Sequence, residues 1–205
     1  MNTVSIRTAS LLAGVSLALM AVLAPLGLMI ALPAGAVGVT ATVVLLIAVL
    51  DVFVAVGLYP VLLPAGALLA ACASGLRLAY AAVFATAAGS LAGPSDVERF
   101  EAVWEMGLFV FAGHLLLVGI AGVRADGIPR WVGVLVLAAG LGYLADSVSI
   151  AIAPATPLAI GEFAFVGEVV LLVWLLGWSG RATSRRVGGH EKLNGDGHEA
   201  DRWRP

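Results

Sequence analysis

The sequence is poor in residues on which soluble proteins and many enzymes depend. Only 12% of its 205 residues are charged, about half the usual share in a soluble domain. Its single cysteine, Cys72, excludes a disulfide within the chain and a CxxC redox pair. Lysine occurs once and the net charge is −2, so the chain lacks the basic surface that nucleic-acid binders need. We therefore expect neither a soluble fold nor a nucleic-acid partner.

Motifs that bind cofactors or carry catalysis are also missing. The sequence contains no P-loop, no GxGxxG and no GxSxG. Its apolar part holds one histidine, His114, which is too few for a bis-histidine haem site or a histidine-rich zinc site. His190 and His198 fall in a polar tail. We expect no metal and no bound cofactor.

Long apolar sequence, in contrast, is abundant. The chain is 61% hydrophobic with a mean hydropathy of +1.05, which is typical of an integral membrane protein. A helix needs about 20 apolar residues to cross a bilayer. The sequence therefore predicts an all-α, polytopic membrane protein with six transmembrane helices. The expected spans are 9–32, 37–59, 65–89, 102–123, 131–153 and 158–178.

The first apolar run permits a second interpretation. Ala34-Gly35-Ala36 resembles the small-residue cleavage site of a signal peptide. The run is longer than the 7–15 residues of a signal-peptide core, so we expect an uncleaved span that Pro25 kinks. Pro60 and Pro64 are expected to end the second span, since helices usually stop before proline.

The arrangement of charge predicts the topology. Residues 1–8 form a short tail, 9–180 the membrane domain, and 181–205 a polar, glycine-rich tail that we expect to be disordered. Six spans place both termini on one side of the membrane. That side receives Arg7, Arg124, Arg130, Arg181, Arg185 and Arg186, and the acidic loop 91–101 lies opposite. The positive-inside rule then predicts cytoplasmic termini in the inner (plasma) membrane.

One span carries an arginine in its middle. Arg77 is the only charged residue in 65–89, and a charge at that depth costs about 2.5–3.5 kcal/mol on insertion scales. Small residues recur every four positions along the same span, at Ala67, Ala71, Gly75 and Ala79. Such stripes let membrane helices approach closely. We therefore expect a central helix, packed on several sides, that holds Arg77 inward.

Other spans carry polar residues at a similar depth. With a rise of about 1.5 Å per residue, five ionisable residues fall about 12–20 Å from one surface, in the middle of the membrane: Asp51, Arg77, His114, Asp146 and Glu168. Tyr80 and Tyr143 lie one helical turn from this set and are expected to donate hydrogen bonds to it. Three carboxylates outnumber one arginine, so we expect a proton to be shared among the acids and His114.

This cluster supports three hypotheses of function. In the first, it binds or transports a small polar or amphipathic ligand, coupled to proton movement. In the second, the protein is a membrane-embedded enzyme acting on a lipid-like substrate, with His114 as general base, Arg77 holding an anionic group and Glu168 beside them. In the third, the cluster only assembles a non-catalytic membrane partner protein. The expected partners are the lipid bilayer and a small-molecule or lipid ligand, and a homo-oligomer is compatible with all three hypotheses.

Several stretches together resemble an uncharacterised prokaryotic family of six-helix membrane proteins, the domain-of-unknown-function family 4386. The resembling segments are 51–60 (DVFVAVGLYP), 77–80 (RLAY), 114–119 (HLLLVG), 128–131 (IPRW), 140–146 (GLGYLAD) and 167–169 (GEV). Members of that family often carry an acidic residue where this chain has Tyr80. The resemblance implies a six-helix membrane fold and brings no biochemical activity with it.

Overall fold

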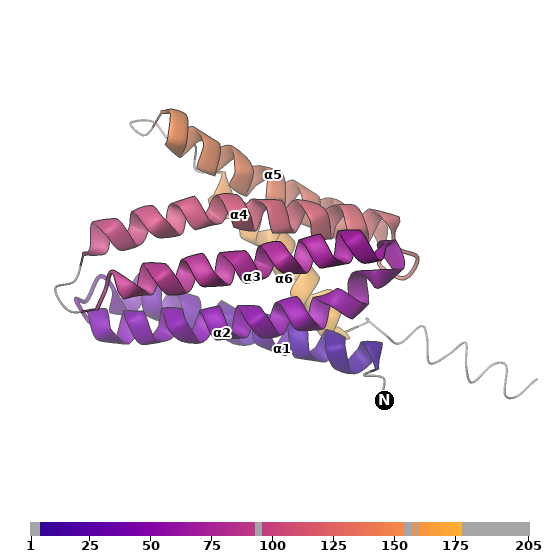
Figure 1. Cartoon of the computed structure of the whole chain (residues 1–205), viewed down its shortest axis with the longest axis horizontal. Helices are drawn as coiled ribbons and strands as arrows, with labels where there is room; N and C mark the ends of the chain where they lie inside the picture. Colours follow the sequence, from indigo (N-terminus) through magenta and orange to yellow (C-terminus); the bar gives the residue numbers. More distant parts are fainter. Residues whose placement is uncertain (1–4, 93–95, 154–157, 159, 178–205) are drawn as a thin grey trace, which may run out of the picture.

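The computed structural model describes residues 5–92, 96–153, 158 and 160–177. Six α-helices follow one another, namely α1 (Ile6–Ala24), α2 (Val37–Leu62), α3 (Ala67–Gly89), α4 (Val97–Arg124), α5 (Arg130–Ile152) and α6 (Gly161–Gly177) (Figure 1). No strand occurs within the described ranges, so the all-α prediction is confirmed. The expected disorder of 181–205 lies outside the described residues.

Five of the helices are long and apolar enough to cross a membrane. A π-helical turn at Pro25–Ala31 extends α1, and a 3-10 turn at Leu63–Ala65 extends α2. These five units contain 23 to 29 residues. At a rise of about 1.5 Å per residue, each helix is longer than the thickness of a bilayer core, which is about 30 Å. The sixth helix, α6, has 17 residues. The chain is a multi-pass membrane protein.

Local signals set where two of the helices begin. The Ser5 hydroxyl accepts a hydrogen bond from the Thr8 amide at 3.0 Å and caps α1. The Asp96 carboxylate does the same for the Arg99 amide at 2.8 Å. A side chain that accepts from these otherwise unpaired amides stabilises the first turn. This cap explains why α4 begins at residue 97, before the apolar run predicted at 102–123.

The prolines interrupt the helices less than expected. Pro25 opens the π-helical turn that continues α1. Pro60 lies inside α2, which runs on to Leu62, so the prediction that Pro60 ends the helix is wrong. Proline removes one backbone donor near the end of a helix, and membrane helices tolerate this. The chain reverses at Gly66, whose φ of 124° favours glycine.

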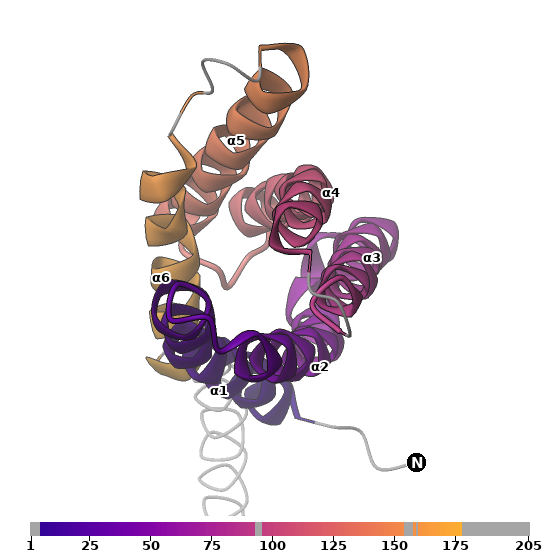
Figure 2. The same ribbon diagram turned by 90° about the vertical axis from the view of Figure 1, so that its left-hand side faces the viewer.

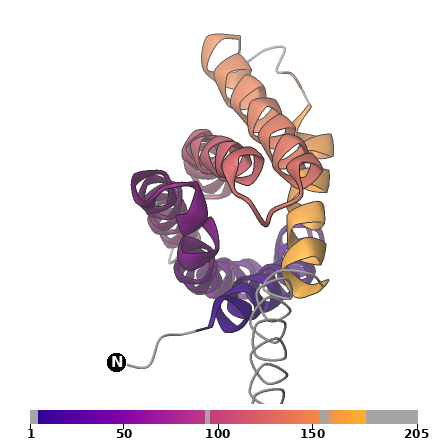
Figure 3. The same ribbon diagram turned by 90° about the vertical axis from the view of Figure 1, so that its right-hand side faces the viewer.

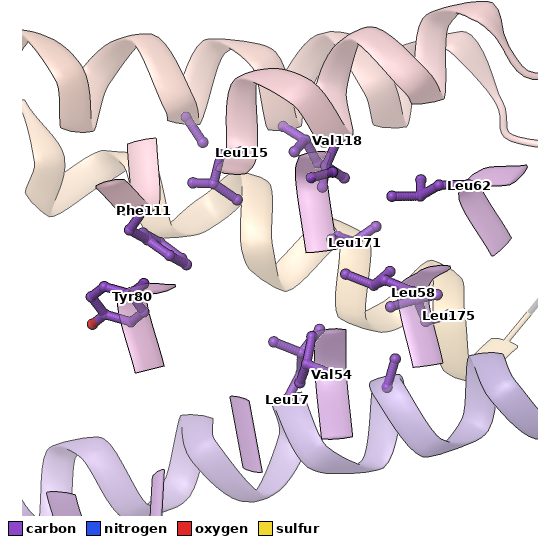
Figure 4. Close-up of a cluster of buried hydrophobic side chains, with 14 of the residues drawn as sticks. Leu17, Val54, Leu58, Leu62, Tyr80, Phe111, Leu115, Val118, Leu171 and Leu175 are labelled. Carbon is purple, nitrogen blue, oxygen red and sulfur yellow. The ribbon is translucent and has the colours of Figure 1, made fainter. Parts of the chain in front are cut away.

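The six helices form a ring in chain order. Each helix packs on the next, and α6 returns to α1 and closes the ring. Figures 2 and 3 show this ring from its two ends, with α6 between α5 and α1. Apolar side chains fill the interior toward the end at which α1 begins and α6 ends, among them Leu58, Leu62, Leu115, Val118, Leu171 and Leu175 (Figure 4). A cavity of about 10 Å³ among these helices has at most the space of one water molecule and is lined by apolar surface, so this half of the bundle is apolar.

Backbone contact between helices occurs mainly at α4 and α5. A Cβ added at Gly119 would lie 2.6 Å from the Leu137 amide nitrogen, and one at Gly140 would lie 2.8 Å from the Leu116 nitrogen. Only glycine permits such an approach, because any side chain would displace the neighbouring backbone. These two helices are therefore held in one register.

The small-residue stripe of α3 does not take part in packing. Ala67, Ala71, Gly75 and Ala79 are all exposed, and nothing lies within 4 Å of a Cβ built at Gly75. The prediction that α3 is central and packed along this stripe is therefore wrong. The opposite face of α3 packs on α2 and α4 and carries Arg77 inward.

The first and last helices are joined at one end of the ring. The Arg7 guanidinium donates to the carbonyl oxygens of Leu175 at 3.1 Å and Leu176 at 2.6 Å. The Ser10 hydroxyl donates to the Leu175 carbonyl at 2.7 Å. The last carbonyls of a helix lack partners within it, and a cation suits this negative end of the helix dipole. Ile6 and Gly177 therefore lie at the same end of the bundle, and the side of the membrane on which that end lies stays a prediction.

Candidate functional site

Three neighbouring helices bring three of the predicted residues together. Asp51 from α2, Arg77 from α3 and His114 from α4 are 0%, 1% and 0% exposed. The Arg77 Nε donates to Asp51 Oδ1 at 2.6 Å, and Arg77 Nη2 lies 2.5 Å from the same oxygen. The partner that Arg77 requires at this depth is therefore Asp51. We call these three residues the triad.

His114 is held by both of its ring nitrogens. Nδ1 lies 2.8 Å from the Ala73 carbonyl oxygen, and Nε2 lies 3.3 Å from Arg77 Nη1. A guanidinium can only donate, so Nε2 accepts and Nδ1 carries the proton. This arrangement fixes a neutral imidazole. It leaves no free nitrogen with which His114 can act as a base.

The backbone of α3 explains why the triad forms there. A long side chain on a helix lies over the preceding turn, which for Arg77 is the turn of Ala73 and Ser74. The Ala73 carbonyl is thereby presented to His114 beside the guanidinium. Asp51 Oδ2 and the Ser74 hydroxyl are also buried, and neither meets a hydrogen-bond partner among the described residues.

Phe111 belongs to this site although the sequence analysis did not single it out. The Arg77 Cζ lies 5.0 Å from the centre of the Phe111 ring, within the range of a cation–π interaction. The ring also lies 5.8 Å from that of His114. An aromatic residue three positions before His114 shares its helix face, and this spacing could have revealed it.

Tyr80 packs against aromatic rings. Its ring centre lies 4.8 Å from that of Phe111 and 5.6 Å from that of Phe84. Figure 4 shows Tyr80 and Phe111 facing each other. No hydrogen bond joins Tyr80 to the triad in the described part of the chain. The expected donation is therefore not found, and Tyr80 supports the site by packing.

A second polar group lies on α5 and α6. The Tyr143 hydroxyl donates to Glu168 Oε1 at 3.1 Å, and both residues are half-buried. The Tyr143 ring meets Phe111 edge-on at 5.5 Å. A continuous series of contacts therefore crosses five helices, from Asp51 through Arg77, Phe111 and Tyr143 to Glu168.

The described hydrogen bonds of Asp146 lie within α5 and just before α6. Its Oδ1 accepts from the Ile160 amide at 3.0 Å, and its carbonyl accepts from the Ser149 hydroxyl at 2.8 Å. It therefore contacts the chain just before α6. The prediction that Asp146 shares one cluster with the triad stays a prediction. Figure 2 shows α5 leaning away from the other helices of the ring.

Comparison with known proteins identifies the family. The family model described as "Domain of unknown function (DUF4386)" matches residues 12–177. The chain belongs to the DUF4386 family. An uncharacterized protein of Archaeoglobus fulgidus is 34% identical over 133 residues, which cover 65% of this chain and 79% of that protein. No solved structure matches the chain.

The DUF4386 match contains every candidate residue of both polar groups. Arg7 and Ser10, which hold the end of α6, precede it. Within the described ranges, no three His, Cys, Asp or Glu side chains are placed to hold a metal ion. The candidate residues that the structure describes are the sealed triad, the half-buried pair of Tyr143 and Glu168, and Asp146.

Proposed function

We propose that this DUF4386 protein binds a small polar or amphipathic ligand at Glu168 and Tyr143, and that the ligand exchanges with a proton on Glu168. One observation carries the proposal. Glu168 is a half-buried carboxyl group within a membrane bundle, and its hydrogen-bond partner is the neutral Tyr143.

The charges in the bundle support this choice. Arg77 is matched by Asp51, and the hydrogen bonds of His114 make it neutral. No described cation then lies in an ion pair with Glu168. A bare carboxylate at membrane depth is costly, so Glu168 needs a proton or a cationic group. A site that alternates between the two exchanges a proton for a ligand.

Access to the pair also supports the proposal. The triad is sealed from every side, whereas Tyr143 and Glu168 retain exposed surface. The half of the bundle nearest Ile6 and Gly177 is packed with apolar side chains. A ligand therefore approaches Glu168 from the opposite end or from the lipid.

The triad fits the structural role among the three hypotheses. Its ion pair and hydrogen bonds join α2, α3 and α4, and a buried pair of this kind fixes how helices assemble in lipid. The enzyme hypothesis gains no support, because both nitrogens of His114 are occupied. In this proposal the triad holds the bundle and Glu168 handles the ligand.

The proton itself is the probe that tests the proposal. Purified protein in lipid nanodiscs is cycled between about pH 5 and pH 9 while infrared difference spectra record the protonated carboxyl group. We expect a band that Glu168→Gln removes and that Tyr143→Phe shifts, because the phenylalanine cannot donate. Glu98→Gln, at an exposed position in the first turn of α4, is the matched control and keeps the band.

Ligand exchange is tested in the same spectra. At a fixed acidic pH, the organic cation tetramethylammonium should diminish the Glu168 band as it displaces the proton. A band that persists in Glu168→Gln would show that another carboxyl group titrates. A band that no pH change and no cation alters would refute the proposal.

A further inference from the structure

Two positively charged residues flank the turn between α4 and α5. Arg124 is the last residue of one membrane-spanning unit, and Arg130 is the first residue of the next. Both side chains are exposed, and the turn lies at the end of the ring that faces the viewer in Figure 3. Neither guanidinium has a hydrogen bond or an ion pair within the described part of the chain. Two unmatched cations therefore lie at the level where the membrane meets water.

Close contact between the two helices brings these arginines together. A Cβ built at Gly133 would lie 2.6 Å from the Val123 amide nitrogen, so the backbones of α4 and α5 touch at this end. Val123 directly precedes Arg124, and Gly133 follows Arg130 by about one helical turn. Both long side chains can therefore reach the same anion. A phosphate group suits them, because arginine donates paired hydrogen bonds to its oxygens.

An apolar face of α5 continues from the arginines into the membrane. Trp131 is 58% exposed, Val134 53% and Leu141 55%. Spacings of three and seven residues place these side chains on one side of the helix. Tryptophan prefers the headgroup level of a bilayer, and the two aliphatic side chains lie deeper. The order of charge, tryptophan and aliphatic side chains matches the order of phosphate, glycerol and acyl chain in a phospholipid.

One acidic residue lies in the same turn. Asp126 is exposed, and among the described residues it forms an ion pair with neither arginine. Two arginines against one aspartate leave an excess of positive charge in the turn. A zwitterionic headgroup carries a cation of its own, which this excess repels, whereas an anionic headgroup is attracted. The turn therefore favours a phospholipid with net negative charge.

From these observations we propose that the turn between α4 and α5 is a binding site for an anionic phospholipid. Arg124 and Arg130 hold the phosphate, and Trp131 lies beside the glycerol. One acyl chain follows Val134 and Leu141 along α5. The inference does not depend on the proposed function.

Quenching of a fluorescent label by brominated lipid tests this site. In a Cys72→Ala background, Leu135→Cys carries a bimane label beside the proposed acyl chain. The matched control is Val148→Cys, about 20 Å further along α5; these positions are 39% and 38% exposed. In nanodiscs of phosphatidylcholine, a rising fraction of the lipid is replaced by brominated phosphatidylglycerol or by brominated phosphatidylcholine.

The label at Leu135 should respond far more strongly to the anionic lipid. Each arginine near a membrane surface contributes about fivefold to the binding of anionic lipid. Half-quenching should therefore need about 25-fold less brominated phosphatidylglycerol than brominated phosphatidylcholine. At Val148 the two lipids should quench equally.

Variants assign this preference to the turn. Arg124→Gln/Arg130→Gln should abolish it, and each single variant should reduce it by about fivefold. Asp126→Asn should increase it, because the variant removes the opposing charge. Arg99→Gln, at an exposed position in the first turn of α4 and thus at the opposite end of the ring, should leave it unchanged.

Equal quenching of the Leu135 label by the two lipids would overturn the proposal. A preference of the same size at Val148 would also overturn it, because the lipid would then be attracted to the whole protein. The same conclusion follows if the preference persists in the double variant once circular dichroism shows that this variant is folded. If the double variant folds poorly, the two single variants and Asp126→Asn decide the matter, since the proposal requires all three to act in the stated directions.

Discussion

Replacement of Arg77 by leucine tests whether the ion pair organises the bundle. The substitution leaves the carboxylate of Asp51, which is 0% exposed, without its partner. Breaking a buried pair in this way costs about 3–5 kcal/mol. The lost contact with Phe111 adds about 0.5–2 kcal/mol, while hydrogen bonds inside membranes average only about 0.6 kcal/mol each. The unpaired carboxylate therefore dominates the loss.

The expected loss lies near the lower end of that range, at about 3 kcal/mol, because Asp51 can take up a proton once the arginine is gone. Arg77→Lys keeps the charge and loses the planar fork, so it should be less destabilising. The double variant Asp51→Leu/Arg77→Leu removes both charges and should be close to the wild type.

The free energy of unfolding is measured by titration with sodium dodecyl sulfate in mixed micelles, followed by circular dichroism. Arg99→Leu is the control, because this arginine is exposed in the first turn of α4 and should change stability by no more than about 0.5 kcal/mol. The reasoning is refuted if Arg77→Leu unfolds like Arg99→Leu. It is also refuted if the double variant is as unstable as Arg77→Leu alone.

Three further predictions concern packing, protonation and topology. Gly119→Ala should lower the free energy of unfolding by about 1–3 kcal/mol, because its Cβ would lie 2.6 Å from backbone. Gly75→Ala, whose Cβ meets nothing within 4 Å, should raise it by up to about 1 kcal/mol. Equal free energies of unfolding for the two variants would contradict this prediction. Nitrogen NMR should show His114 as a neutral ring protonated at Nδ1 throughout about pH 5 to 9, and a signal that moves with pH would show that the ring titrates. Cysteines at Ser95 and Thr183, outside the described residues, should react with impermeant reagents from opposite sides of the membrane, and labelling from one side would exclude six spans.

The depth of a residue along its helix could be predicted from the sequence, whereas the direction in which its side chain points around the helix could not. Counting residues from the nearest loop placed Asp51, Arg77 and His114 at one level, and the structure brings the three together. The same counting placed Asp146 at that level. Residue counts assume upright helices, whereas α5 leans away from the ring (Figure 2), and the Asp146 carboxylate accepts from the Ile160 amide just before α6.

The rotation of α3 shows the same limit. A stripe of small residues and an arginine were both expected to face the bundle, although Gly75 and Arg77 lie about 200° apart on a helix of 3.6 residues per turn. The cost of exposing a charge to lipid exceeds the gain from small-residue packing. Arg77 therefore takes the inner face, and the stripe faces outward. Phe111 was missed because an apolar residue in an apolar helix does not stand out by its type. Only its spacing of three residues from His114 indicated that it shares the same helix face.

The contact between Arg7 and the end of α6 has a consequence for the way the protein is made. The atoms that it joins are 168 and 169 residues apart in the chain. During synthesis, chain segments emerge in order from the N-terminus. The contacts of Arg7 and Ser10 with α6 therefore form only after nearly the whole bundle has been inserted. Their partners, the carbonyls of Leu175 and Leu176, arrive with the last turn of the last helix. The contact between α1 and α6 is thus the last one of the ring to form. A chain whose synthesis stops before α6 is left with an open ring of helices.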